Sequence, residues 1–302
     1  MNKLKNIVIL GAGAVGVLPA EKLLKTSGIS LICAADIRRV ERYRRDGIFF
    51  NGVKLPLTFA APEEMKNFPE ADLILVATKT PSLAEALDNV VPVTGKNTIF
   101  LPLLNGITAH EVIAEKFPDN TVLRGYFLGH ASVRNGNKIC HDGVGKFYCG
   151  GDPEALRQVQ ELFDSAGIGM EIPADMDSAI WKKFVLNVGI NQTQAVFSAD
   201  YGMVQRSGEM QEFCRKLMAE ALLIAETEGI PGTAEMIPAA MEVIMNMPGS
   251  VKTSMLQDIT ARRPSEVDAF AGTICRKAEK YGIPVPYNRQ VLEKITRIEA
   301  EL

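Results

Sequence analysis

A glycine pattern near the start of the chain constrains the fold more than any other feature. Residues 11–16 read Gly-Ala-Gly-Ala-Val-Gly, directly after the apolar run Asn6–Leu10 and at the start of the helix-like segment Val15–Thr26. A GxGxxG sequence that joins a strand to a helix is typical of dinucleotide-binding folds, whereas the same glycines elsewhere form ordinary turns. We therefore predict a strand, a tight turn and a helix whose first amide groups face a pyrophosphate.

The three glycines of this motif have separate physical roles. Gly11 permits the tight turn, Gly13 lets the backbone approach the pyrophosphate, and Gly16 allows the helix and the strand to pack closely. The predicted cofactor-binding loop comprises Gly11, Ala12, Gly13, Ala14, Val15 and Gly16.

The first half of the chain alternates short apolar runs with helical patterns, which favours an open α/β sheet with right-handed crossovers. The apolar runs are almost continuously hydrophobic, as parallel strands covered on both faces should be. Two glycine-punctuated segments, Gly47–Leu57 and Lys138–Gly150, have the pattern of hairpins or edge strands. Further strands are expected at Ile29–Ala35, Leu73–Ala77, Ile99–Leu103 and Val122–Tyr126, and a further helix at Pro81–Val90.

The character of the sequence changes near Asp175, after which helical patterns punctuated by prolines continue to the end of the chain. Ser265 followed by Asp268 has the form of a capping box at the start of one helix. We therefore predict an α/β Rossmann-like domain over residues 1–174 and an all-α domain over residues 175–302. Helices are expected at Met176–Phe197, Glu209–Glu228, Thr233–Asn246, Ser254–Arg262 and Ser265–Tyr281.

Composition argues against several classes of function. The 302 residues carry a formal net charge of −3 without a block of like charges, which argues against nucleic acid or an acidic membrane surface as the main partner. No segment approaches about 18 uninterrupted apolar residues, so we expect no membrane span. The five cysteines are scattered without a CxxC pair, which favours reduced thiols in the cytoplasm. His110, His130 and His141 lack metal-ligand spacing, so we expect no metal site.

Polar residues follow three of the predicted strands, at the edge where open α/β sheets bind ligands. Asp36 follows the second strand, where an acidic residue usually binds the ribose hydroxyls of NAD. The adjoining Arg38 and Arg39 could instead hold the 2′-phosphate of NADP, or simply begin a solvated helix. The residues alone therefore leave NAD and NADP open. Lys79 and Asn105 follow the next two strands and are expected on the nicotinamide side of the cofactor.

A polar stripe runs along the first helix of the second half. Lys183, Asn187 and Asn191 have the spacing i, i+4 and i+8, which places them on one face of a helix. The residues between Phe184 and Ile190 are otherwise apolar or glycine, so this helix is expected to be buried almost all round. Buried amide groups need a partner, which can be a ligand or a structural network, and the added lysine favours a ligand site.

Together these features resemble the ketopantoate reductase (2-dehydropantoate 2-reductase) family over nearly the whole chain. The resemblance implies a Rossmann-like dinucleotide-binding domain and a helical domain that binds substrate and carries catalytic groups. It also implies NADPH-dependent reduction of the small 2-keto acid ketopantoate in pantothenate and coenzyme A synthesis. For the oligomeric state, a homodimer is one expectation. The matching stretches are GAGAVG at 11–16, ATKT at 77–80, LLNG at 103–106, WKKFVLNVGIN at 181–191 and SMLQDITARRPSEVDAF at 254–270, of which the last two are specific to the family.

The resemblance also assigns roles to single residues. By position, Lys183 resembles the catalytic acid of the family, which agrees with the chemistry, because hydride attack on a ketone creates an alkoxide that an ammonium group can stabilise and protonate. Glu266 resembles a residue near both the cofactor and the reacting centre. The remaining assignments are Asn187, Asn191 and Ser254 as substrate contacts, Lys79 as a cofactor contact, and Asn105 as a contact of both.

Three departures from the family pattern leave the substrate and the cofactor open. The family often continues Asn-Pro-Leu-Thr/Ser-Ala where residues 191–195 read Asn-Gln-Thr-Gln-Ala. Tyr201 stands where some members have a substrate-binding asparagine, and Asp36 stands where NADPH-using members commonly have arginine. NADP is therefore the expected cofactor, with NAD allowed by Asp36. The alternatives are a dehydrogenase for a different branched 2-keto acid and a non-catalytic dinucleotide-sensing regulatory protein, which would not need the polar stripe.

Overall fold

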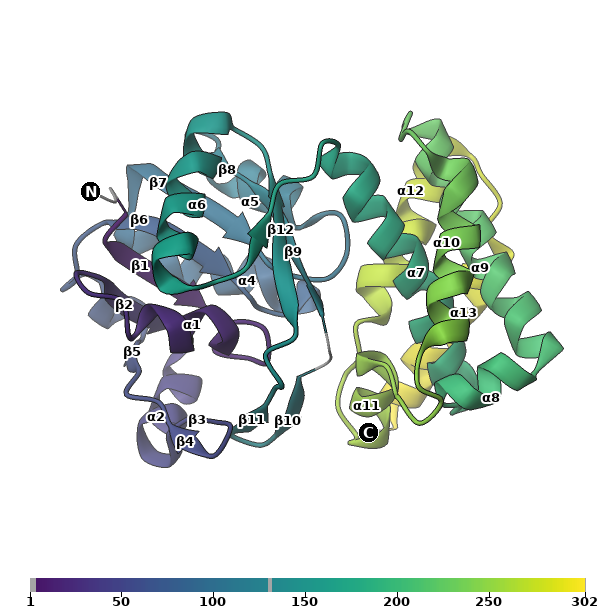
Figure 1. The fold of residues 1–302 in the computed structure, drawn as a ribbon, viewed down its shortest axis with the longest axis horizontal. Helices are drawn as coiled ribbons and strands as arrows, with labels where there is room; N and C mark the ends of the chain where they lie inside the picture. Colours follow the sequence, from purple (N-terminus) through teal and green to yellow (C-terminus); the bar gives the residue numbers. More distant parts are fainter. Residues whose placement is uncertain (1–3, 130–131, 302) are drawn as a thin grey trace. The chain divides into compact units, whose positions relative to one another are not determined.

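In the computed structural model, which describes residues 4–129 and 132–301, the first of two units (Met1–Met176) is built around a six-stranded sheet. The strand order is β5-β2-β1-β6-β7-β8, and every neighbouring pair is parallel (Figure 1). The predicted α/β Rossmann-like fold of the N-terminal half is therefore confirmed. The strands are β1 (Asn6–Leu10), β2 (Ser30–Ala34), β5 (Thr58–Ala60), β6 (Ala71–Val76), β7 (Thr94–Pro102) and β8 (Thr121–Val122).

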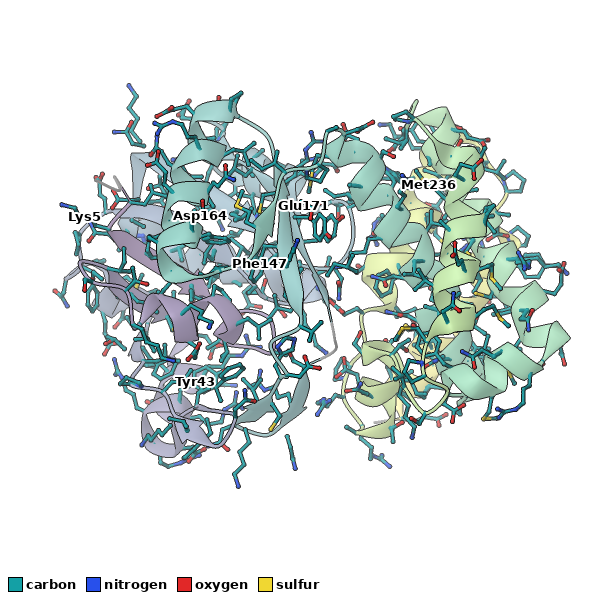
Figure 2. All side chains as sticks on the ribbon, viewed as in Figure 1. Lys5, Tyr43, Phe147, Asp164, Glu171 and Met236 are labelled. Atoms are coloured by element: carbon teal, nitrogen blue, oxygen red, sulfur yellow. The ribbon has the colours of Figure 1, made fainter. Side chains whose placement is uncertain are left out.

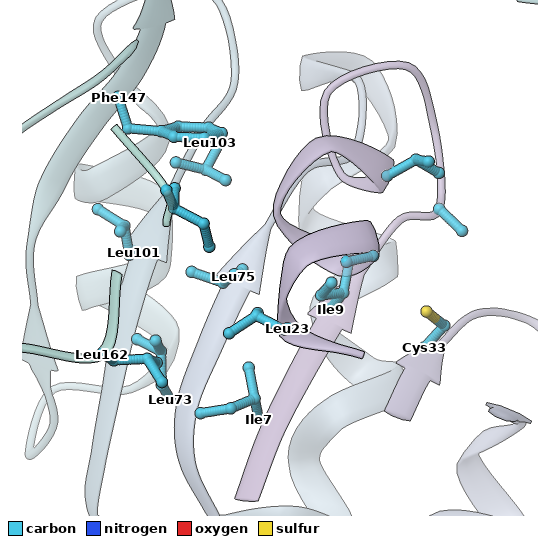
Figure 3. Close-up of a cluster of buried hydrophobic side chains, with 14 of the residues drawn as sticks. Ile7, Ile9, Leu23, Cys33, Leu73, Leu75, Leu101, Leu103, Phe147 and Leu162 are labelled. Carbon is cyan, nitrogen blue, oxygen red and sulfur yellow. The ribbon is translucent and has the colours of Figure 1, made fainter. Parts of the chain in front are cut away.

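Side chains of this sheet, drawn with all others in Figure 2, point alternately into two hydrophobic cores. Ile7 and Ile9 of β1 pack with Leu23 of α1, as Figure 3 shows, whereas Val8 and Leu10 belong to the core on the opposite face. Each fully buried aliphatic side chain contributes roughly 1.5–3 kcal/mol, so both faces must be covered by helices. The helices are α1 (Val17–Leu23), α2 (Ile37–Asp46), α3 (Pro62–Met65), α4 (Leu83–Ala86), α5 (Ala109–Lys116) and α6 (Pro153–Ala166), with 3₁₀ turns η1 (Thr80–Ser82) and η2 (Leu87–Val93).

Two smaller sheets in this unit correct part of the strand prediction. The segment Gly47–Leu57 does contain an antiparallel hairpin, but Lys138–Gly150 is neither a hairpin nor an edge, because its two strands join different sheets. Val122–Tyr126 was expected to form one strand and is likewise divided between two sheets. The partners of these short strands lie far away along the chain, which a local pattern does not reveal. One sheet has the order β10 (Val133–Asn135), β11 (Lys138–Cys140), β3 (Phe49–Phe50), β4 (Val53–Lys54), and the other has the order β13 (Met170–Glu171), β12 (Gly145–Gly150), β9 (Arg124–Gly129).

The second unit (Asp177–Leu302) contains only helical elements among its described residues, which confirms the all-α prediction. Its first helix, α7, spans Met176–Phe197 as predicted. Two helices, α8 (Tyr201–Arg206) and α13 (Pro286–Ala300), were not predicted. The others are α9 (Gly208–Thr227), η3 (Thr233–Glu235), α10 (Met236–Asn246), α11 (Ser254–Thr260), the π-helical segment η4 (Asp268–Gly272) and α12 (Thr273–Tyr281).

The capping box predicted at Ser265 is wrong. Asp268 pairs with Arg276 at 2.6 Å instead of reaching back to the start of the helix. The Ser265 side chain accepts a hydrogen bond from the Val267 amide at 3.2 Å and donates one to Glu299 on α13. Because Glu299 lies 34 residues further along the chain, only the tertiary structure supplies this competing partner.

A buried polar network holds α7, α9 and α13 together. The Glu220 carboxylate on α9 accepts hydrogen bonds from the backbone amides of Tyr287 and Asn288, both at 2.8 Å, and so satisfies the start of α13. The Asn288 amide group donates to Glu220 at 2.7 Å and accepts from Gln192 of α7 at 3.0 Å. Gln192, one of the departures from the family pattern, therefore packs helix against helix.

The fold requires glycine at two positions of the glycine motif, Gly11 and Gly16, but not at Gly13. A Cβ atom on Gly16 would lie 2.2 Å from the carbonyl oxygen of Gly11, and one on Gly11, where φ is +102°, would lie 2.8 Å from the carbonyl oxygen of Ala77. A Cβ atom on Gly13 would meet no described atom closer than 3.5 Å, which is ordinary van der Waals contact. The described residues thus leave room for a side chain at residue 13, so they do not themselves require glycine there.

This contrast predicts opposite effects of two similar substitutions. Gly16→Ala should destabilise the protein by about 1–3 kcal/mol or more, because the new methyl group overlaps backbone. Gly13→Ala should change the free energy of unfolding by less than about 1 kcal/mol. Urea unfolding followed by circular dichroism measures both values, and a Gly13→Ala variant as unstable as Gly16→Ala would contradict the distinction.

Candidate functional site

The carboxyl edge of the parallel sheet gathers the predicted residues of the first unit. The glycine loop follows β1, and its residues Gly11, Gly13, Ala14 and Val15 are partly exposed. The next strands in the sheet are β6 and β7, so the loops after them lie along the same edge. The Thr80 hydroxyl donates to the carbonyl oxygen of Asn105 at 3.2 Å and joins these two loops. The structure therefore brings the glycine loop, Lys79 and Asn105 to one side of the sheet.

A basic side chain that the sequence analysis missed lies over the glycine loop. The guanidinium nitrogen Nη1 of Arg134, on β10, is 3.5 Å from the place that a Cβ atom of Gly13 would occupy. Beside it, the Ser132 hydroxyl donates to the carbonyl oxygen of Ala14 at 3.4 Å. Guanidinium groups bind phosphate oxygens with two hydrogen bonds, so this arrangement fits a pyrophosphate. Arg134 lies far from the motif along the chain, and no local pattern identifies it.

Asp36 has a structural role in addition to its predicted one. It is the N-cap residue of α2, where one carboxylate oxygen accepts a hydrogen bond from the Arg39 amide at 2.9 Å. The other oxygen lies 3.3 Å from Nε of Arg39. Arg38 and Arg39 are therefore exposed residues in the first turn of α2, and Arg39 is paired with the carboxylate. Each oxygen keeps a lone pair for a ribose hydroxyl, so the cap and a cofactor contact are compatible.

The polar stripe of α7 lies on a helix that is otherwise well packed. Phe184 contacts the ring of Phe270 in the segment η4 at 6.2 Å, and Trp181 of the same helix packs against Phe184 at 5.4 Å. Asn191 is only 6% exposed, and Asn187 is partly buried. Within the described residues, neither asparagine side chain has a hydrogen-bond partner. A structural network does not account for these two amides, which leaves them available to a ligand.

Lys183, the first residue of the stripe, is electrostatically coupled to Glu266. Burial lowers the pKa of the Lys183 ammonium to about 8, and the negative charge of Glu266 acts in the opposite direction. Glu266 is only 8% exposed and lies two residues before the start of η4. The neighbouring Ser265 amide donates to Glu299 at 2.8 Å and fixes this segment to α13. A lysine with this pKa can give up its proton near neutral pH, as a general acid must.

Ser254 is the exposed first residue of α11, and its position is linked to the stripe through the preceding residue. The amide of Thr253 donates to the side chain of Gln194 on α7 at 2.9 Å. Tyr201 is buried, and burial raises the pKa of its hydroxyl to about 12, so it is neutral at physiological pH. The structure therefore brings together Lys183, Glu266, the asparagines and, through Gln194, the start of α11 within the second unit.

Neither a metal centre nor a membrane helix is found in the described part of the chain. No three histidine, cysteine, aspartate or glutamate residues within 4–129 and 132–301 are arranged to hold a metal ion. His130, one of the three histidines considered for metal binding, lies outside the described residues. None of the described helices is both long and apolar enough to cross a bilayer.

The chain is similar to known proteins over nearly its whole length. A 2-dehydropantoate 2-reductase of Streptococcus pyogenes serotype M3 is 28% identical over 311 residues, covering 98% of each chain. A D-mandelate dehydrogenase solved with NADH and anilino(oxo)acetate has a TM-score of 0.87 at 24% identity, covering 98% of this chain and 99% of its own. A dimeric ketopantoate reductase of Staphylococcus aureus has a TM-score of 0.82 at 22% identity, with the same coverage. At these identities the two solved structures show a shared fold.

Sequence models of one family match both halves of the chain. The ketopantoate reductase PanE/ApbA model matches residues 7–153, and the C-terminal model of the same family matches residues 175–299. These matches include the glycine loop, both strand-end loops, the polar stripe and the segment from Ser254 to Glu266. The chain therefore belongs to the ketopantoate reductase (PanE/ApbA) family of nicotinamide-dinucleotide-dependent oxidoreductases.

Proposed function

We propose that this protein reduces ketopantoate (2-dehydropantoate) to pantoate with hydride from NADPH, in the synthesis of pantothenate and coenzyme A. The observation that carries the proposal is the stripe on α7, where a lysine with a pKa of about 8 shares one helix face with two asparagine side chains that bind no other described residue. The name of the S. pyogenes relative supports the same substrate. In this proposal residues 1–174 bind the dinucleotide, and residues 175–302 bind and protonate the substrate.

The carboxyl edge of the parallel sheet would hold the cofactor, which supplies the hydride when bound. Backbone amides of the glycine loop and the guanidinium of Arg134 would bind the pyrophosphate, and the absence of a side chain on Gly13 gives the phosphates room to approach. Lys79 and Asn105 would contact the nicotinamide half, because their loops follow the neighbouring strands β6 and β7. Asp36 would accept hydrogen bonds from the adenosine ribose.

The second unit would supply the proton. As hydride reaches the carbonyl carbon, the negative charge moves to the carbonyl oxygen, and the Lys183 ammonium stabilises it and donates a proton to form the alcohol. Asn187 and Asn191 would donate to the substrate from the same helix face, and Ser254 would bind its other polar end. Glu266 favours the charged form of Lys183, which keeps a proton on the ammonium before the reaction.

Two further features are proposed from weaker support. A homodimer is proposed because the S. aureus enzyme of the same fold is described as dimeric. A cytoplasmic location is proposed because the five cysteines, of which Cys33, Cys149, Cys214 and Cys275 are buried, all carry free thiols.

A second candidate function is the reduction of a different branched 2-keto acid. It is favoured by Tyr201, which puts a buried aromatic ring where some family members have a substrate-binding asparagine. The D-mandelate dehydrogenase structure shows that this fold also serves another 2-hydroxy acid. A non-catalytic dinucleotide sensor is less well supported, because it would gain nothing from a half-buried lysine aligned with two amides that have no hydrogen-bond partner in the described part of the chain.

The proposed function predicts that the enzyme oxidises NADPH in the presence of ketopantoate and that Lys183→Ala lowers kcat by about 10²–10⁴-fold. The cofactor Kd should barely change, because Lys183 acts on the substrate oxygen. Lys182→Ala is the matched control, since this neighbouring lysine is exposed. Faster turnover of another branched 2-keto acid would favour the second candidate, and a Lys183→Ala enzyme within threefold of the wild type would refute the assignment of the acid.

A second prediction concerns pH. Because the reduction needs protonated Lys183, kcat/KM for the keto acid should be level below about pH 8 and fall as the pH rises through the pKa of this lysine. Glu266→Gln removes a negative charge that raises this pKa, so the falling limb should move to lower pH. The exposed Glu293 provides the control Glu293→Gln, which should leave the limb in place. A limb that stays unmoved in Glu266→Gln would show that the two groups are not coupled.

A third prediction separates the two roles of Asp36. Asp36→Asn keeps an N-cap oxygen for α2 but removes the charge that repels a 2′-phosphate. The wild type should use NADH within about tenfold of NADPH, and the variant should shift the ratio of kcat/KM values toward NADPH by about tenfold. Asp152→Asn, at the N-cap of α6, is the control for loss of charge at a cap and should leave the ratio unchanged. A strong NADPH preference that Asp36→Asn does not alter would show that Asp36 does not face the ribose.

A further inference from the structure

A fully buried glutamine extends the polar stripe of α7. Gln194 is 0% exposed and follows Lys183 by eleven residues, which brings it to within roughly 20° of the lysine around an ideal helix. Its side-chain oxygen accepts a hydrogen bond of 2.9 Å from the backbone amide of Thr253, 59 residues further along the chain. Gln194 thus joins the helix that carries the stripe to the start of α11.

Thr253 is the N-cap residue of α11 and directly precedes Ser254. Its own side chain does not cap the helix, and its hydroxyl has no hydrogen-bond partner among the described residues. The segment that leads to Thr253 is held by two backbone hydrogen bonds. The amide of Tyr201 donates to Val251 at 3.2 Å, and the amide of Gly202 donates to Gly249 at 2.8 Å. Gln194 provides the last attachment before Ser254.

The bond to Thr253 is the one hydrogen bond that Gln194 makes through its side chain within the described residues. Its amide nitrogen is buried without a partner there, and burying an unpaired polar group destabilises a protein. An apolar residue would fill the same space without that cost. A glutamine at this position is therefore explained by the oxygen that holds Thr253.

Gln192 shows what a purely structural glutamine looks like on the same helix. It is also 0% exposed, but its amide donates to the carbonyl oxygen of Val188 at 2.8 Å and to Asn288 at 3.0 Å. These partners belong to the network that packs α7 against α9 and α13. The two glutamines match in type and burial and differ in the segment that each one holds.

We infer that Gln194 is a positioning residue for substrate binding, which fixes the start of α11 so that Ser254 stands in a set place relative to Lys183, Asn187 and Asn191. This inference rests on the proposed function, in which Ser254 binds the keto acid. Gln194 does not itself touch the substrate. Its effect passes through the amide of Thr253, so it should govern the strength of substrate binding more than the rate of the chemical step.

Gln194→Met tests the inference because it keeps the length and the burial of the side chain and removes the oxygen. We expect KM for the keto acid to rise at least tenfold, with kcat within threefold of the wild type and KM for the dinucleotide unchanged. Hydrogen exchange of the Thr253 amide, measured without substrate, should become faster. Gln192→Met is the control and should lower Tm by about as much as Gln194→Met does. It should leave KM for the keto acid within twofold of the wild type, and the Thr253 amide should stay protected from exchange.

Gln194→Glu serves as the conservative variant, because burial favours the neutral carboxyl, which is close in shape to the amide and keeps an oxygen that can accept from Thr253. It should retain a KM for the keto acid within threefold of the wild type. The positioning role would be overturned if KM rose as much in Gln194→Glu as in Gln194→Met. It would also be overturned if KM rose as much in Gln192→Met as in Gln194→Met. A wild-type protein that turned over no 2-keto acid would overturn the proposed function instead, and slower or unchanged exchange of Thr253 in Gln194→Met would overturn the inference by itself.

Discussion

Burial of both faces of the parallel sheet is the constraint on which the first unit depends. Ile7 and Ile9 need the helices on one face, and Val8 and Leu10 need those on the other, so each strand must be followed by a crossover that returns to the same end. All six strands therefore present their carboxyl ends at one edge. Hydrophobic burial, which has no direction of its own, in this way fixes where the glycine loop, Lys79 and Asn105 gather.

In the second unit the main constraint is the burial of polar side chains between helices. Gln192, Asn288 and Glu220 form a chain of hydrogen bonds, and these bonds stabilise the packing of three helices. Asn187 and Asn191 lie on the same long helix without such partners among the described residues. The scaffold differs from the candidate site in that its polar side chains bind one another across helices, whereas the two asparagines of the stripe bind no described side chain.

Burial also changes the pKa of Lys183. Removing an ammonium group from water disfavours its charged form, and the nearby Glu266 carboxylate limits the effect, so that the pKa settles at about 8. In the proposed function, a proton held at that level would be available to a developing alkoxide at neutral pH and would still be bound before the reaction. Asp36 likewise combines two roles, because the carboxylate proposed to bind the ribose also caps α2.

Local sequence patterns are enough to predict the class of fold, the span Met176–Phe197 of the central helix, the glycine loop and the face shared by Lys183, Asn187 and Asn191. These features follow from local periodicity and from the conformational freedom of glycine, which neighbouring residues reveal. Three contacts depend instead on how the helices and strands pack: Ser265 binds Glu299, Arg134 lies beside Gly13, and Gln194 holds Thr253. Each of those contacts joins residues from about thirty to over a hundred positions apart, and a hydrogen bond at that separation depends on how whole elements pack, which no local pattern encodes.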